Sequence, residues 1–339
     1  MKKLRVLVLT HPQSVPPDDL SKLTDNERME LKTDLDVLAT LRAMEHEVRM
    51  LGIADELQPI RDTVNEFAPD IVFNLLEEFH GNTLYDQNVV SFLELLRVPY
   101  TGCNPRGLIL SREKSLAKKL LIYHRIHVPA FHVFPLGRKM RRPRSLAFPL
   151  IVKSLTEHAS LGISQASLVN DDDELAERVA FVHRRVGTDA LAERFIVGRE
   201  IYVGILGNDR LTAMSARELV FEKASPDMPL IATARAKHNF AYQQRYGIEQ
   251  KAADGLPPKV EATLATISKR IYRILGLSGY ARLDYRLSAD GQLWFLEANA
   301  NPDLADGEEF ASSAAQSGID YPELLQRIIA LGLRAGGKE

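Results

Sequence analysis

The sequence predicts an α/β protein whose N-terminal part is a mostly parallel, Rossmann-like sheet covered by helices. Short apolar runs alternate with segments of helical spacing over the first hundred residues, which is the pattern of βα units. Polar stretches, NLLEEFHGN and TGCN, follow two of the expected strands, where ligands of parallel sheets bind. The chain has 339 residues, 45% of them hydrophobic, which is enough for two or three packed domains.

Four strands and three helices are expected in the first hundred residues. The expected strands are 4–9, 46–51, 70–76 and 98–102, and the expected helices lie within 25–45, 60–67 and 86–97. The first strand is not followed by a G-x-G-x-x-G motif, so we do not expect a dinucleotide site there.

In the remainder of the chain expected strands and helices alternate again, and residues 105–127 are expected to form a helical region. Further strands are expected at 148–154, 190–196 and 199–206, and further helices at 171–185 and 257–275. Asp171 is a good N-cap for its helix, with Glu174 three residues later. A basic run, Arg138 to Arg144, is interpreted as a solvated connector, with a docking loop for an anionic partner as the alternative.

Composition and charge exclude several classes of protein. The net charge is -2, so the chain has no overall basic field for a nucleic acid or an anionic membrane. No stretch approaches the ~18–20 apolar residues of a membrane span, and we interpret MKKLRVLVLTHPQ as a first strand rather than a signal peptide. The single cysteine, Cys103, fits a cytoplasmic protein, although a secreted protein without disulfides would look the same.

The stretch ARLDYRLSADGQLWFLEAN, residues 281–299, is expected to be a β-hairpin. Asp290-Gly291 is a strong signal for a two-residue turn, which would fix the register of the two strands. The pairs that would then face each other are Asp284 with Glu297 and Arg282 with Asn299, all on one side of the ribbon. The opposite side would carry Leu283, Tyr285, Leu296 and Ala298.

Two carboxylates directly opposite each other on a ribbon repel, so a cation is expected between them. Oxygen ligands with an amide nearby suit Mg²⁺ or Mn²⁺, with substrate phosphates completing the shell. Arg282 would lie within reach of the same space as a fixed cation. The alternative is an exposed ribbon whose acids pair with arginines at its surface.

The hairpin ending in EANANP resembles the metal-binding strand pair of the ATP-grasp superfamily, and within it of D-alanine–D-alanine ligase and its relatives. The resemblance covers about residues 70–331 and implies a two-lobed ATP-grasp part of α+β character. The implied domains are 1–105, the N-terminal domain, 106–190, the central lobe, and 191–335, the C-terminal lobe. On this resemblance Asp284, Glu297 and Asn299 would hold two Mg²⁺ ions, and Arg282 would face the reacting carbonyl.

Four further segments resemble the nucleotide-binding parts of the family, in the same order along the chain. The resemblance implies that ATP phosphates are bound by Lys114, Lys153, Lys237 and the loop from Ser160 to Gly162. It further implies that Glu193 takes the adenine amino group, that Phe195 and Ile196 line the ring, and that Glu200 binds the ribose.

The substrate side departs from the family pattern. The first strand lacks the expected Gly-rich loop, and Asp303 and Glu308 stand near the expected glycine and serine. These acids, with Asp306 and Glu309, suggest a cationic or amine-bearing second substrate, or alternatively cap the following helix. Ala159 and His238 stand at the positions of the family's flap contacts, and His80 and His158 are candidates to face substrate.

The resemblance implies an ATP-dependent carboxylate–amine ligase that works through an acyl phosphate on small molecules such as amino acids or peptides. D-alanine–D-alanine ligase itself is one alternative, and an ATP-binding module without turnover is another. A homodimer is a further expectation from the resemblance.

Overall fold

The computed structural model describes residues 2–17, 19–156, 163–225, 228–233, 235–236 and 239–336. Its N-terminal part is a parallel sheet of order β2-β1-β3, which confirms the predicted α/β class. The strands are β1 (Arg5–Thr10), β2 (Glu47–Gly52) and β3 (Ile71–Asn74). The surrounding helices are α1 (Asp25–Glu30), α2 (Lys32–Ala43), α3 (Gln58–Phe67) and α4 (Asp86–Leu95).

The apolar run in β1 follows from its central place in this sheet. Val6 and Val8 pack into one hydrophobic cluster, whereas Leu7 and Leu9 pack into another on the opposite face. Because helices cover both faces, alternate residues do not need to be polar. The sequence of β1 is therefore continuously hydrophobic from Val6 to Leu9.

The expected fourth strand, 98–102, is reduced to one isolated bridge between Val72 and Tyr100. Pro99 has no N–H to donate to a ladder, and its carbonyl accepts from the Val72 N–H at 2.8 Å. The helical region 105–127 is also divided. It forms α5 (Pro105–Arg112) and α6 (Lys114–Tyr123), because Glu113 ends the first helix and caps the second by accepting from the Ser115 N–H.

A smaller antiparallel sheet of order β4-β7-β5-β6 follows. Its strands are β4 (Phe131–Phe134), β5 (Leu150–Ser154), β6 (Leu168–Val169) and β7 (Ala190–Arg194). Helix α7 (Asp172–Phe181) contributes Leu175 and Val179 to the core of this part. The basic run lies between β4 and β5, where Arg142 pairs with Asp172 at 2.6 Å.

Asp171 caps α7 as predicted, accepting from the N–H groups of Asp173 and Glu174. Replacing Asp171 with alanine should lower the free energy of unfolding by about 1 kcal/mol, because two N–H groups lose their acceptor. Urea denaturation measures the change. Glu177→Ala, on an exposed face of the same helix, is the control, and an equal loss in both variants would contradict the capping role.

The largest sheet is antiparallel, with order β11-β10-β8-β12-β13 and the short β9 beside β8. Its strands are β8 (Arg199–Leu206), β9 (Thr212–Ala213), β10 (Arg217–Phe221), β11 (Ile248–Ala252), β12 (Tyr280–Leu287) and β13 (Leu293–Asn299). The helices of this part are α9 (Phe240–Tyr246), α10 (Pro258–Ile274), α11 (Glu309–Gln316) and α12 (Tyr321–Gly336). Short 3-10 turns lie at Pro12–Ser14, Leu20–Lys22, Thr83–Tyr85 and Gln165–Ser167, and a π turn lies at Val182–Val186.

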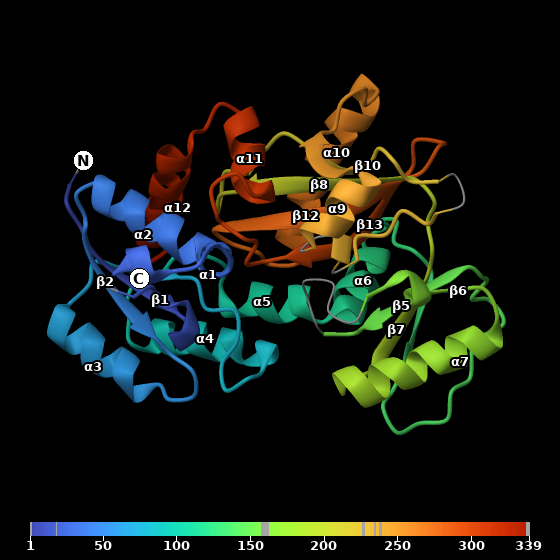
Figure 1. Cartoon of the computed structure of the whole chain (residues 1–339), viewed down its shortest axis with the longest axis horizontal. Helices are drawn as coiled ribbons and strands as arrows, with labels where there is room; N and C mark the ends of the chain where they lie inside the picture. The colour runs from blue at the N-terminus through green and yellow to red at the C-terminus, as the bar shows by residue number, and fades with distance from the viewer. Residues whose placement is uncertain are drawn as a thin grey trace.

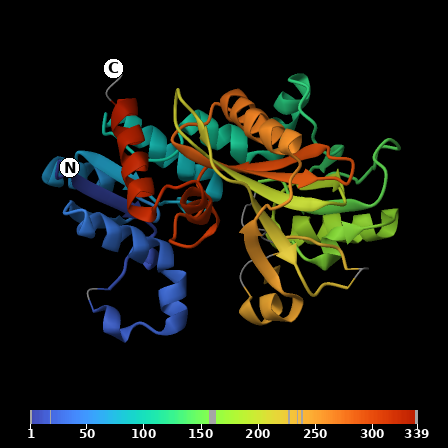
Figure 2. The same cartoon turned by 90° about the horizontal axis from the view of Figure 1, so that it is seen from above.

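The C-terminal helix returns to the N-terminal sheet. Figures 1 and 2 show α12 beside the strands at the N-terminal end of the molecule, far from the smaller sheet. Leu324 and Ile328 of α12 belong to the same hydrophobic cluster as Val6 and Ile71. One face of the largest sheet is packed instead by α5, α6 and α10. Across the described part of the chain, no helix combines the length and the apolar character needed to cross a membrane.

The hairpin turn between β12 and β13 differs from the prediction. The Ser288 N–H donates to the Gln292 carbonyl at 3.0 Å, so the loop has three residues rather than two. Near the turn the register is consequently shifted by one residue, and Tyr285 faces Phe295 instead of Leu296.

A β-bulge in β13 cancels this shift. The register changes between Asp284 and Tyr285, so Asp284 faces Glu297 and Arg282 faces Asn299, as predicted. The extra residue is Leu296. It lines the same pocket as Asp284 and Glu297, so its predicted place on the opposite face is wrong.

Candidate functional site

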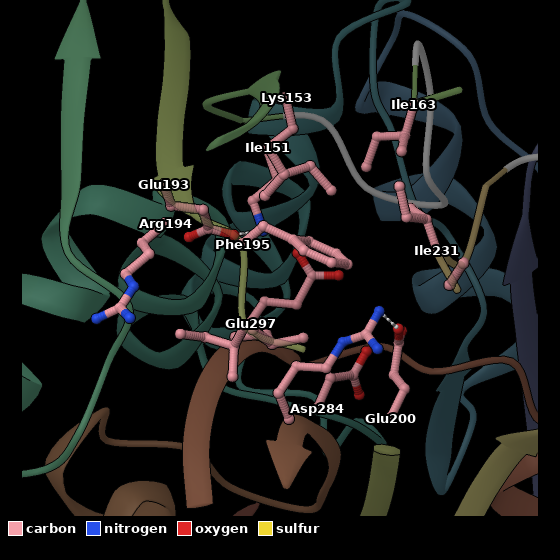
Figure 3. Close-up of a pocket in the computed structure, with 14 residues that line it drawn as sticks. Ile151, Lys153, Ile163, Glu193, Arg194, Phe195, Glu200, Ile231, Asp284 and Glu297 are labelled. Atoms are coloured by element: carbon pink, nitrogen blue, oxygen red, sulfur yellow. Dashed lines mark ion pairs between the residues drawn. The ribbon is translucent and has the colours of Figure 1, made fainter. Parts of the chain in front are cut away.

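A pocket lies between the smaller sheet and the largest sheet, and Figure 3 shows the side chains that line it. Lys153 and Ile151 enter from β5, and Asp284 and Glu200 lie on the opposite side. The apolar lining consists of Ile151, Ile163, Phe195, Ile196, Ile231, Ala232 and Leu296. The charged lining includes Lys153, Glu193, Glu200, Asp284, Arg286 and Glu297. An apolar slot with a few placed polar groups is typical of a small-molecule site.

Glu193 of β7 is the centre of a buried ion cluster. Its Oε2 lies 3.0 Å from Nζ of Lys118, and its Oε1 pairs with Nζ of Lys153. Burial alone would raise the pKa of Glu193, but the two ammonium groups together lower it below its usual value. The carboxylate therefore stays ionised at the edge of the apolar slot.

Glu200 of β8 is fixed by two partners. The Tyr202 hydroxyl donates to its Oε1 at 2.9 Å, and Nη2 of Arg286 lies 2.6 Å from its Oε2. Arg286 also donates to the carbonyls of Gly198 and Leu230 and lies 5.5 Å from the Phe195 ring centroid. Arg286 thus links the strand that carries Glu200 to the segment around Phe195.

The two carboxylates of the hairpin have different surroundings. Asp284 accepts from Nε and Nη2 of Arg282, at 2.8 and 2.9 Å. Oε2 of Glu297 lies 3.8 Å from Nζ of Lys114. Burial lowers the pKa of Lys114 to about 8, although Glu297 opposes the shift. Each carboxylate therefore has a cationic partner of its own.

Arg282 has a second acid partner in Glu309 of α11, which pairs with its Nη1. Gln250 of β11 donates to the other oxygen of Glu309. The arginine is buried, with 7% of its surface exposed, and it lies 5.0 Å from the Tyr202 ring centroid. Two carboxylates, Asp284 and Glu309, thus face one guanidinium.

The side chains of the pocket and of the hairpin can be compared with what ATP and a divalent cation require. The aliphatic walls suit a flat base, and the ionised Glu193 at the edge of the slot suits an amino group. For the cation, Asp284, Glu297 and Asn299 offer two carboxylates and an amide. Within the described ranges, no group of three or more histidine, cysteine or acidic side chains is arranged to hold a metal. The residues therefore fit Mg²⁺ only with phosphate oxygens as further ligands.

Several predicted residues lie away from the pocket, and others fall outside the described residues. Six candidates fall outside the described residues, namely His158, Ala159, Ser160, Gly162, Lys237 and His238. Asn299 does not line the pocket, and its side-chain oxygen accepts from the Asn301 N–H at 3.0 Å. His80 is exposed in a tight turn, with a left-handed φ of 57°.

The predicted substrate acids have local partners. Oδ1 of Asp303 accepts from the Thr33 hydroxyl at 2.6 Å and from the Ala305 N–H at 2.8 Å. Glu308 occupies the N-cap position of α11 but makes no side-chain capping bond. Glu308 thus stands at the helix N-terminus, where the alternative placed it, without a capping bond, and Asp303 organises its own loop.

The sequence prediction missed several residues of this site, among them Lys118, Arg286 and Leu296. Two of these three, Lys118 and Arg286, could have been found from their spacing in the sequence. Lys118 follows Lys114 by four residues, so it lies on the same face of the helix, and Arg286 follows Asp284 by two residues on one strand. Leu296 could not have been found in this way, because its orientation depends on the bulge.

Known proteins and a known protein family are similar to this chain in sequence. A family model described as "D-ala D-ala ligase C-terminus" matches residues 126–330. The D-alanine–D-alanine ligase of Bordetella petrii is 32% identical over 256 residues, 74% of this chain and 73% of the relative. That of Nitratidesulfovibrio vulgaris strain DP4 is 30% identical over 301 residues, 88% of this chain and 91% of the relative. The uncharacterized protein y4sG of Sinorhizobium fredii is 32% identical over 268 residues, 78% and 75% of the two chains.

The fold is shared with solved structures. The structure of D-alanine–D-alanine ligase from Bacillus anthracis complexed with ATP superimposes with a TM-score of 0.74, covering 98% of each chain at 21% identity. The fold and the pocket define an ATP-grasp ligase, a class that forms C–N bonds with release of ADP and uses ATP with a divalent cation. The family model spans well over half of the 339 residues. The chain belongs to the D-alanine–D-alanine ligase family.

Proposed function

We propose that this protein joins two D-alanine molecules, or closely similar small amino acids, with conversion of ATP into ADP and phosphate. The observation that carries the proposal is the pocket itself, where Glu193, Lys153 and Glu297 converge from three strands around an apolar slot. The names of the relatives support D-alanine as the substrate to test first.

In the proposed complex the base of ATP lies against Phe195 and Ile196, with its amino group at Glu193 and its ribose at Glu200. Lys114 and Lys153 face the phosphates, and the family resemblance adds Lys237 and the loop from Ser160 to Gly162, which lie outside the described residues. Asp284, Glu297 and Asn299 would hold Mg²⁺ or Mn²⁺, which when bound neutralises charge on the triphosphate.

The reaction has two steps. A carboxylate oxygen of the first substrate attacks the γ-phosphorus, which forms an acyl phosphate and releases ADP. The amine of the second substrate then attacks the acyl carbon, loses a proton and displaces phosphate. Arg282 is proposed to stabilise the negative oxygen that develops on that carbon.

A second candidate is a ligase of the same class whose acceptor carries an additional amine. It is supported by the pairing of Arg282 with Glu309, because this carboxylate reduces the attraction of the site for a substrate carboxylate. Asp303 and Glu308, on the same loop, add further negative charge. An acceptor bearing a cation would be favoured by this arrangement.

The test is ADP release with ATP, Mg²⁺ and single amino acids. Stimulation by D-alanine alone, with D-alanyl-D-alanine detected by mass spectrometry, is the result expected from the first candidate. Stimulation only when a diamine or a basic amino acid accompanies the first substrate would favour the second candidate. ATP binding without stimulation by any amino acid would contradict both and favour a binding module without turnover.

A further inference from the structure

Lys118 of α6 is a buried lysine that joins two strands of the pocket. Its side chain is fully buried, and its Nζ lies 3.0 Å from Oε2 of Glu193 in β7. The same ammonium donates to the carbonyls of Leu296 at 2.7 Å and of Phe295 at 3.5 Å, both in β13. One ammonium group thus forms an ion pair with a carboxylate of β7 and donates to two backbone carbonyls of β13.

The two carbonyls lie at the β-bulge. There the extra residue, Leu296, disrupts the ladder between β12 and β13, and β13 is an edge strand of its sheet. The outer backbone groups of an edge strand need partners outside the sheet. The Phe295 N–H donates to the His127 carbonyl at 2.9 Å, and Lys118 serves the carbonyls on either side of the bulge.

The bulge determines where Glu297 lies. Without the extra residue, the register set by the turn would place Leu296 opposite Asp284 and would turn Glu297 to the other face. Bulges beside active sites re-aim side chains in this way. A group that holds the bulge therefore holds the orientation of Glu297.

We propose that Lys118 is a positioning residue, which fixes the bulge in β13 and thereby aims Glu297 at the divalent cation. Because the same ammonium binds Glu193, it couples the proposed adenine end of the pocket to the proposed metal end. This inference rests on the metal role of Glu297 in the proposed function and extends it to a residue that touches neither ATP nor the cation.

The experiment compares Lys118→Met with Lys119→Met, the neighbouring and exposed lysine of the same helix. Mn²⁺ binding in the presence of ATP is measured by electron paramagnetic resonance. Lys118→Met should weaken Mn²⁺ binding by about 10- to 100-fold, the usual effect of losing a group that orients a metal ligand. Lys119→Met should bind Mn²⁺ like the wild type.

Amide hydrogen exchange of the ligand-free protein is the second measurement. Residues 294–299 should exchange faster in Lys118→Met, whereas the segment of α10 should be unchanged. Wild-type Mn²⁺ affinity and unchanged exchange at 294–299, with only a lower melting temperature, would overturn the inference. If Lys118→Met does not fold, the uncharged polar variant Lys118→Gln takes its place, and wild-type Mn²⁺ affinity in that variant would equally overturn it.

The proposed function and this inference can fail separately. A wild-type protein that binds Mn²⁺ with ATP but releases no ADP with any amino acid contradicts the ligase proposal. The effect of Lys118→Met on Mn²⁺ binding and on exchange would still decide the inference, since neither reading requires an amino-acid substrate.

Discussion

Replacing Glu297 with glutamine should lower the rate of ADP formation by more than about a hundredfold, because the cation loses a carboxylate ligand. Glutamine has nearly the same shape, and the Glu297 side chain is 22% exposed, so the fold should persist. Nζ of Lys114 lies 3.8 Å from Oε2 of Glu297 and would lose only part of its compensation. Steady-state rates over a range of Mg²⁺ concentrations measure the effect.

The control for this prediction is Glu261→Gln, an exposed carboxylate in α10. It should leave the rate and the melting temperature unchanged. Full activity in Glu297→Gln would show that Glu297 does not hold the cation. A large drop in melting temperature would instead point to a structural role.

Replacing Glu193 with glutamine should destabilise the fold by about 3–5 kcal/mol, the usual cost of removing one partner from a buried ion cluster. The side chains of Lys118 and Lys153 are 0% and 8% exposed, so both ammonium groups would lose their buried counter-charge. Urea denaturation gives the change in the free energy of unfolding.

The double variant Glu193→Gln, Lys118→Met is the matched control, because it removes one of the two buried lysines that have lost their counter-charge. It should recover part of the lost stability. A loss below about 1 kcal/mol in the single variant would mean that water or another group already compensates the lysines.

The hairpin shows what could be predicted from the sequence. The pairing of Asp284 with Glu297 was predicted correctly, but from a two-residue turn that the structure does not have. A longer loop and a bulge offset each other, and the bulge depends on contacts with α6 that lie far away in sequence. Alternation along a strand identifies a face, but it cannot reveal where one residue is inserted.

The other predictions also succeeded where local sequence determines the structure and failed where distant contacts do. Local signals succeeded where the chain determines its own structure, as at Asp171, whose cap needs only neighbouring N–H groups. The expected strand 98–102 failed because Pro99 limits its pairing to one bridge. The positions of Lys153, Glu193 and Glu200 in one pocket came from a family resemblance, since three separate strands bring them together. No spacing along the chain encodes that convergence.

The return of α12 to the N-terminal sheet bears on the order of events during synthesis. Val6 and Ile71 are made early, yet the hydrophobic surface that covers them includes Leu324 and Ile328. Domains usually fold as units while the ribosome is still working. Here the N-terminal sheet cannot complete its core until α12 has been translated, so the sheet exposes apolar surface while the residues between β3 and α12 are made.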